Sequence, residues 1–60
     1  MRAITAPDFF KLLADSSKRP GHADRVDADH TEYWYLPEGV IVARQIGVFG
    51  SPSTYYASEA

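Results

Sequence analysis

The chain contains no cysteine, so neither a disulfide nor a zinc site built from thiolates can stabilise its fold. It also lacks any apolar run near the roughly 18 residues that a membrane-spanning helix needs. The N-terminal segment holds one arginine but no continuous apolar stretch, so we expect no signal peptide. These absences predict a soluble protein of the cytoplasm.

An excess of positive charge is missing too. Six Lys and Arg stand against eight Asp and Glu, which gives a net charge of −2 at pH 7. Nucleic-acid binders usually need a basic excess, because phosphate contacts supply most of their affinity. There is also no nucleophile elbow, phosphate-binding loop or Gly-rich cofactor fingerprint. We therefore expect no enzyme activity, no cofactor, and no preference for nucleic acid.

The length of 60 residues predicts one domain, 1–60. A domain of this size buries only about 60% of the surface that its unfolded chain exposes, so its stability is marginal. Small domains are usually supported by disulfides, a metal or a second chain. Association with another chain is the support that this composition leaves open.

The first third of the chain predicts one amphipathic helix, from about residue 6 to residue 16 or 17. Thr5 is placed to accept a hydrogen bond from the backbone N–H of Asp8, and Pro7 suits the first turn. Phe9, Leu12 and Leu13 form an apolar stripe at helical spacing. The Pro-Gly pair at 20–21 is expected to end the helix, and residues 1–4 fit a short extended segment.

The second half holds most of the aromatic and β-branched residues, and turn residues divide it into segments. The predicted strands are 32–36, 40–48 and 54–57. The turns lie at 37–39 and 50–53, where Pro and Gly are concentrated. Gly47 is a candidate β-bulge, because the alternation along 40–48 is ambiguous.

The predicted fold is α+β, with one N-terminal amphipathic helix packed on a three-stranded antiparallel β-meander (αβββ). The third strand is expected at the edge of the sheet. An antiparallel sheet can leave one face open to water. The residues expected to be most buried are Phe9, Leu13, Trp34 and one of Ile41 or Val42.

Residues 19–30 form a polar middle segment that we expect to be a loop. Its imidazole and carboxylate groups are suitable ligands for zinc or manganese. They are His22, Asp24, Asp27, Asp29 and His30. Their spacing matches no metal-binding motif, so we expect a solvated loop without a metal.

The first predicted strand alternates two tyrosines, Tyr33 and Tyr35, with Trp34 and Leu36. If Trp34 and Leu36 face the helix, both tyrosines face outward. We expect Tyr55 or Tyr56 to join them from the third strand, together with Arg44. Tyr and Arg are favoured anchors of protein interfaces. Ordinary cross-strand packing of aromatic residues explains the same pattern equally well.

In size, acidity and lack of catalytic motifs, the chain resembles the small proteins that phages and mobile elements encode, such as anti-CRISPR inhibitors. That resemblance implies inhibition of a host protein and assigns a role to no particular residue. We expect a non-catalytic protein-binding module whose partner is another protein or a second copy of the chain. The alternative is a small nucleic-acid-associated regulatory protein that stacks bases on an aromatic sheet face.

Overall fold

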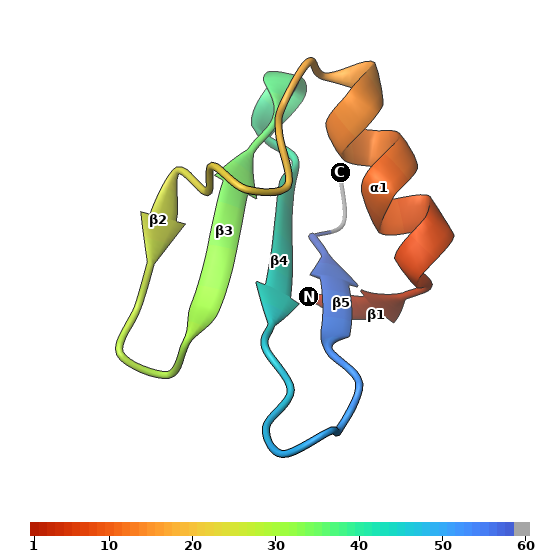
Figure 1. Cartoon of the computed structure of the whole chain (residues 1–60). Helices are drawn as coiled ribbons and strands as arrows, with labels where there is room; N and C mark the ends of the chain where they lie inside the picture. Colours follow the sequence, from red (N-terminus) through yellow and green to blue (C-terminus); the bar gives the residue numbers. More distant parts are fainter. Residues whose placement is uncertain (59–60) are drawn as a thin grey trace.

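Within residues 1–58, five antiparallel strands form one sheet with a single α-helix against it (Figure 1). The computed structural model describes residues 1–58. The elements are β1 (Arg2–Ile4), α1 (Ala6–Asp15), β2 (Arg25–Val26), β3 (Thr31–Tyr35), the 3-10 turn η1 (Pro37–Gly39), β4 (Ile41–Gln45) and β5 (Thr54–Ala57). The strand order across the sheet is β1-β5-β4-β3-β2. The α+β class predicted from the sequence is confirmed.

The helix α1 begins and ends through local hydrogen bonds. The Thr5 hydroxyl accepts from the Asp8 N–H at 3.2 Å, as predicted. The helix stops at Asp15, earlier than predicted, because Ser17 takes a left-handed conformation with φ 57°. The Lys18 N–H then donates to the Leu13 carbonyl at 2.9 Å, which closes a Schellman-type end. Over residues 1–58, no helix has the length and apolarity to cross a membrane.

The prediction of three strands is wrong, because two short strands extend the sheet. β1 pairs with β5, so β5 lies inside the sheet and β1 forms the edge. β2 lies within the segment 19–30, which was predicted to be a loop, and it pairs with β3. Strands of three and two residues carry no readable alternation, and pairing with a neighbouring strand defines them.

The two hairpin connections of the aromatic half differ from each other. Leu36 donates to the Val40 carbonyl at 2.7 Å, which closes a tight turn over η1. Strand β4 ends at Gln45, before the predicted 48, and residues 46–53 form a longer loop. Gly47 is not a bulge within a strand; a Cβ at this position would overlap the Ser51 carbonyl oxygen.

The core lies between α1 and one face of the sheet. Phe9, Leu13, Trp34 and Val42 are each at most 1% exposed, which confirms the core predicted from the sequence. The Phe9 and Trp34 rings meet edge-to-face, with centroids 5.2 Å apart. Such a contact adds about 0.5–1.5 kcal/mol to the burial of the two rings.

The segment that follows the helix also covers this face of the sheet. It crosses β4 and β3 to reach β2 (Figure 1). The Trp34 indole Nε1–H donates to the Arg19 carbonyl at 2.9 Å. The Arg44 guanidinium donates to the Pro20 carbonyl at 2.9 Å. Both covering elements therefore lie on the same side of the sheet, and the other side is left open.

We predict that Leu13→Ala lowers the free energy of unfolding by about 2–5 kcal/mol, because it removes a fully buried side chain and leaves a cavity. Urea unfolding followed by tryptophan fluorescence measures the change. Leu13→Met keeps most of the volume and is the control. A Leu13→Ala protein as stable as its parent would contradict this description of the core.

We predict that Gly47→Ala lowers the free energy of unfolding by about 1–3 kcal/mol, since the backbone of Ser51 must move to admit the new methyl group. Gly21→Ala is the matched control, because no heavy atom lies within 4 Å of a Cβ there. Its stability should stay within about 1 kcal/mol of the parent. Equal effects of the two substitutions in urea unfolding would refute the close packing at Gly47.

Candidate protein-binding surface

Three of the predicted tyrosines share the open side of the sheet. Trp34 pairs with Val42, and both side chains face the helix. Tyr33 precedes Trp34 on β3, and its partner Ala43 follows Val42 on β4. Because side chains alternate along a strand, Tyr33 and Ala43 face the opposite side of the sheet. Ala43 pairs in turn with Tyr56. Tyr35 pairs with Ile41 on the same side. We call the set Tyr33, Tyr35, Ile41 and Tyr56 the tyrosine face.

The tyrosine face is a packed surface. Ala43 is only 1% exposed, although neither the helix nor the following segment covers its side of the sheet. Tyr33 and Tyr56 stand directly opposite it on the two neighbouring strands, so their rings shield the small side chain. Tyr35 is more open, with 44% of its surface exposed. The surface thus combines two partly buried rings with one projecting ring.

Tyr33 is fixed by polar contacts at its edge. Its hydroxyl donates to Asp27 Oδ2 at 3.1 Å, and the Arg25 guanidinium lies 5.4 Å from its ring centroid. The hydrogen bond to Asp27, together with burial, raises the pKa of Tyr33, so its hydroxyl stays protonated. Sequence reasoning missed Arg25 because β2, which places it opposite Tyr33, was not predicted.

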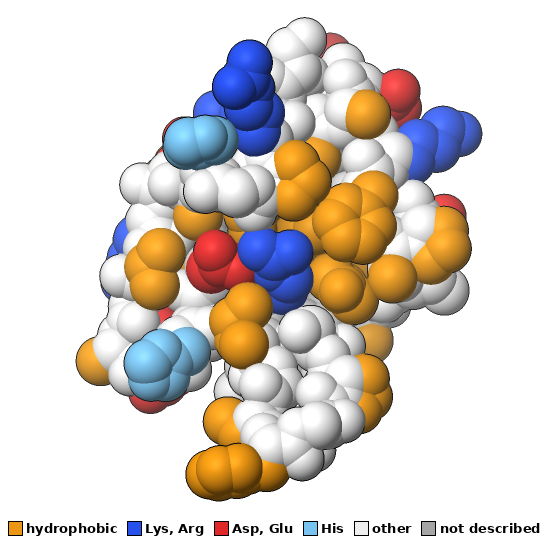
Figure 2. All heavy atoms as spheres, in the orientation of Figure 1, with side chains coloured by type: hydrophobic (Ala, Val, Ile, Leu, Met, Phe, Trp, Pro, Cys, Tyr) orange, Lys and Arg blue, Asp and Glu red, His pale blue; other side chains and the backbone are white. Residues whose placement is uncertain are grey.

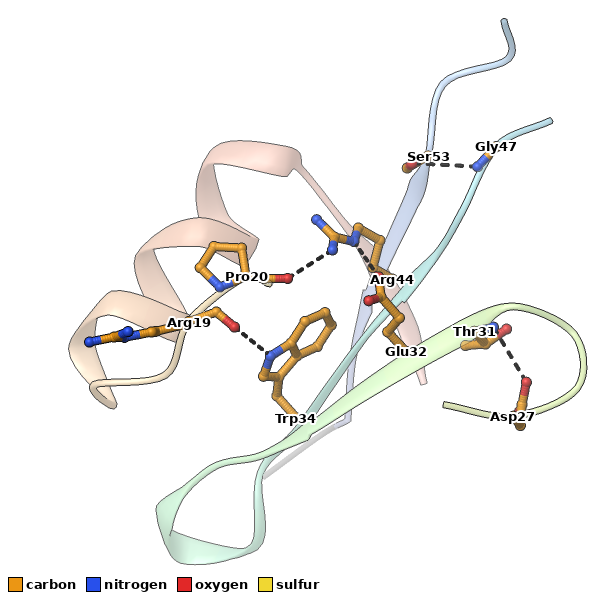
Figure 3. Close-up of polar contacts among 9 residues, drawn as sticks. All are labelled: Arg19, Pro20, Asp27, Thr31, Glu32, Trp34, Arg44, Gly47 and Ser53. Atoms are coloured by element: carbon orange, nitrogen blue, oxygen red, sulfur yellow. Dashed lines mark hydrogen bonds and ion pairs between the residues drawn. The ribbon is translucent and has the colours of Figure 1, made fainter. Parts of the chain in front are cut away.

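The Asp27 carboxylate also closes the turn between β2 and β3. Its Oδ1 accepts from the N–H groups of Asp29 at 3.0 Å and Thr31 at 3.3 Å (the Thr31 contact is drawn in Figure 3). Burial alone would raise the pKa of Asp27, but the hydrogen bonds from Asp29, Tyr33 and Thr31 outweigh it and lower the pKa. The ionised carboxylate is therefore part of the fold.

Asp24 has a similar structural role at the other end of β2. Its Oδ2 accepts from the Tyr35 N–H at 2.8 Å and from the Lys18 ammonium at 2.9 Å. The hydrogen bond from the Tyr35 N–H, followed by that from Lys18, lowers the pKa of Asp24. Within residues 1–58, no three His, Asp or Glu side chains are grouped so that they could hold a metal ion. The polar middle segment thus supplies structural carboxylates.

Arg44 does not lie on the tyrosine face. Arg44 pairs with Glu32, which precedes Tyr33 on β3. Because neighbouring residues of a strand face opposite sides, the Arg44 side chain is on the helix side of the sheet. There its Nε donates to Glu32 Oε1 at 2.8 Å, and its guanidinium lies 5.3 Å from the Trp34 ring centroid (Figure 3). Arg44 also donates to the Pro20 carbonyl, so it connects β3 and β4 to the segment that follows the helix. We call this set of contacts the Arg44 clamp.

Tyr55 is also on the helix side, and Tyr56 is the member of that pair that reaches the tyrosine face. The Tyr55 ring centroid lies 4.7 Å from that of Phe9 and 5.9 Å from that of Phe10. Tyr55 therefore packs against the core. Of the five residues predicted to form a binding surface, the structure brings Tyr33, Tyr35 and Tyr56 together and separates Arg44 and Tyr55 from them.

Comparisons with known proteins add no functional assignment. No protein-family model matches the chain, and neither do curated proteins or solved structures. The tyrosine face offers apolar ring area bordered by hydroxyl groups and one guanidinium. That composition is typical of surfaces that bind other proteins.

We predict that acid destabilises the fold through Asp24 and Asp27. Their folded-state pKa values lie below the ordinary value of 3.8, so their stabilisation is present above that pH and is lost as the pH falls through the folded values. Urea unfolding measured from about pH 7 to about pH 2 should show this loss.

The same network can be tested one residue at a time by NMR titration of the carboxyl groups. Tyr33→Phe removes one donor to Asp27 and should raise the pKa of Asp27. The pKa of Asp24, whose donors are Lys18 and the Tyr35 N–H, should not move and serves as the internal control. An unchanged Asp27 titration would show that the Tyr33 hydroxyl does not hold this carboxylate in solution.

Proposed function

We propose that the chain is a non-catalytic protein-binding module that uses the tyrosine face to occupy a surface of another protein, as a small inhibitor does. One observation carries the proposal. Both covering elements, α1 and the segment 16–24, lie on one side of the sheet, and the tyrosine face lies on the other. An aromatic cluster exposed in this way on a small protein usually marks an interaction site.

The rigidity of the cluster supports protein recognition. Tyrosine supplies a large contact area at a small cost in side-chain entropy, because it has few rotatable bonds. Tyr33 is held by Asp27, and Tyr33 and Tyr56 are packed around Ala43. Tyr35, the most exposed of the three, is suited to enter a partner's surface as an anchor.

The charge around the cluster favours protein over nucleic acid. A surface that stacks bases usually combines aromatic rings with a basic groove along the phosphate backbone. Arg44 is turned away and paired with Glu32. Arg25 lies beside Tyr33, but so does the Asp27 carboxylate. With a net charge of −2, the chain offers phosphates little attraction.

We predict that Tyr35→Ala and Tyr56→Ala each weaken binding to the partner by about 1 kcal/mol or more. Tyr35→Ala should do so with little change in stability, because 44% of the Tyr35 surface is exposed. Partners are identified by cross-linking to the immobilised parent in a cell lysate. The Kd of the purified partner is then measured for the parent and for each variant. Tyr33 is left intact because its hydroxyl supports the turn at Asp27.

Val26→Ser is the matched control, because Val26 is 59% exposed and pairs with Glu32, on the side away from the tyrosine face. It should bind the partner as the parent does. Equal Kd values for the parent and both tyrosine variants would refute the proposal. Binding of single-stranded oligonucleotides with a steep salt dependence, lost in the tyrosine variants, would establish the nucleic-acid alternative.

A further inference from the structure

The loop between β4 and β5 carries a second apolar surface, separate from the tyrosine face. Ile46 and Val48 are exposed, and Phe49 at the tip is fully exposed. Figure 2 shows hydrophobic side chains gathered at the end of this loop, away from the rest of the molecule. The sequence from 45 to 58 contains no charged residue, so the tip is apolar and uncharged.

The tip is held in a conformation that Phe49 does not favour. The Ser51 N–H donates to the Val48 carbonyl at 3.0 Å, which closes a tight turn over Phe49 and Gly50. These two central residues have φ values of 48° and 83°. Positive φ at both positions is typical of type I′ turns, where Asn-Gly is preferred and a bulky aromatic residue is unfavourable.

The base of the loop keeps the tip in place. Gly47 packs so closely on the Ser51 backbone that a side chain cannot fit between them. Its N–H donates to the Ser53 hydroxyl at 3.4 Å (Figure 3). The fold therefore presents an aromatic ring to solvent from an ordered turn, at a cost in backbone energy. Within residues 1–58, the Phe49 ring itself gains no burial that would offset this cost, because it is fully exposed.

A groove lies between β1 and α1. Its volume is about 320 Å³, and its lining consists of Arg2, Ile4, Asp8, Lys11, Leu12 and Asp15. A cavity of about 150 Å³ is enough to hold a benzene ring, so the groove can accept a phenyl side chain. Ile4 and Leu12 are half-buried and pack against the core, and they supply the apolar part. The charged lining residues are two cations and two anions, which gives no preference for an ion.

We propose that Phe49 of one chain inserts into the β1–α1 groove of a second copy. Ile4 and Leu12 supply an apolar contact in a groove of sufficient size, although the other four lining residues are charged, and the loop supplies an uncharged ring that is already exposed. In the described part of the chain, β1 is an edge strand that pairs with β5 on one side. The other side of β1 can therefore receive a loop. Association also removes the exposed Phe49 ring from water.

Sedimentation equilibrium over a concentration series up to about 1 mM tests the contact. The parent should associate reversibly, and Phe49→Asn should raise the dissociation constant at least about tenfold. Asn is favoured at the φ value of this position, so the same substitution should leave the melting temperature equal or higher. Val26→Ser, which removes an exposed apolar side chain elsewhere, should associate as the parent does.

A mixing experiment tests the two halves of the contact. Phe49→Asn retains the groove, and Leu12→Lys retains the Phe49 ring but places a charge in the groove. Each variant alone should be monomeric, whereas an equimolar mixture should form a dimer with one intact contact. If Leu12→Lys does not fold, Lys11→Trp replaces it. Lys11 is exposed and lines the groove, so a tryptophan side chain there can occupy the groove without disturbing the core.

A parent that stays monomeric at about 1 mM would overturn the proposal, as would Phe49→Asn self-association equal to that of the parent. Self-association lost in Tyr35→Ala but kept in Phe49→Asn would place the contact on the tyrosine face. That result would overturn the groove contact and leave the proposed binding role of the tyrosines standing. Phe49-dependent binding of a monomeric parent to phosphatidylcholine vesicles would identify a membrane contact instead.

Discussion

The rest of the structure depends on the burial of Trp34. Its ring packs edge-to-face on Phe9, which fixes the helix against the sheet. A buried indole N–H needs an acceptor, and the Arg19 carbonyl, four residues beyond the end of α1, supplies it. The chain after the helix must therefore cross the same face of the sheet. Arg44 secures this crossing through the Pro20 carbonyl and its position 5.3 Å from the Trp34 ring centroid.

This arrangement determines which surfaces remain for binding. With α1 and the crossing segment on one side, the opposite side of the sheet is covered, as far as residues 1–58 are concerned, by the side chains of the sheet itself. The clamp also takes Arg44 out of reach of the tyrosine face, since the guanidinium is paired with Glu32 on the helix side. The open face therefore combines aromatic area with little positive charge, and this combination supports the proposed protein partner over a nucleic acid.

The sequence predicted those features that depend on residues close together in the chain, and it did not predict those that depend on strand pairing. The start of α1 followed from Thr5 and its spacing to Asp8, and the outward direction of Tyr33 followed from its alternation with Trp34. The side occupied by Arg44 did not follow, because the run 40–48 is apolar in both parities. The pairing of Trp34 with Val42 fixes that side, and this register is a tertiary property. For the same reason, the expected extended segment 1–4 was not predicted to pair with β5, and β2 was missed together with Arg25.

Most of the chain shows agreement between local preference and final structure, as expected for a foldable sequence. Thr5 caps a helix, and Gly39 takes the positive φ of its turn. Phe49 breaks this agreement, because an aromatic side chain occupies a left-handed position that favours Asn or Gly, and its ring is fully exposed. A residue that serves neither its own turn nor the core points to a requirement outside the single folded chain. The tyrosine face lacks such a conflict, since its rings also stabilise the sheet. Phe49 is therefore the position at which an effect on association can be separated from an effect on folding.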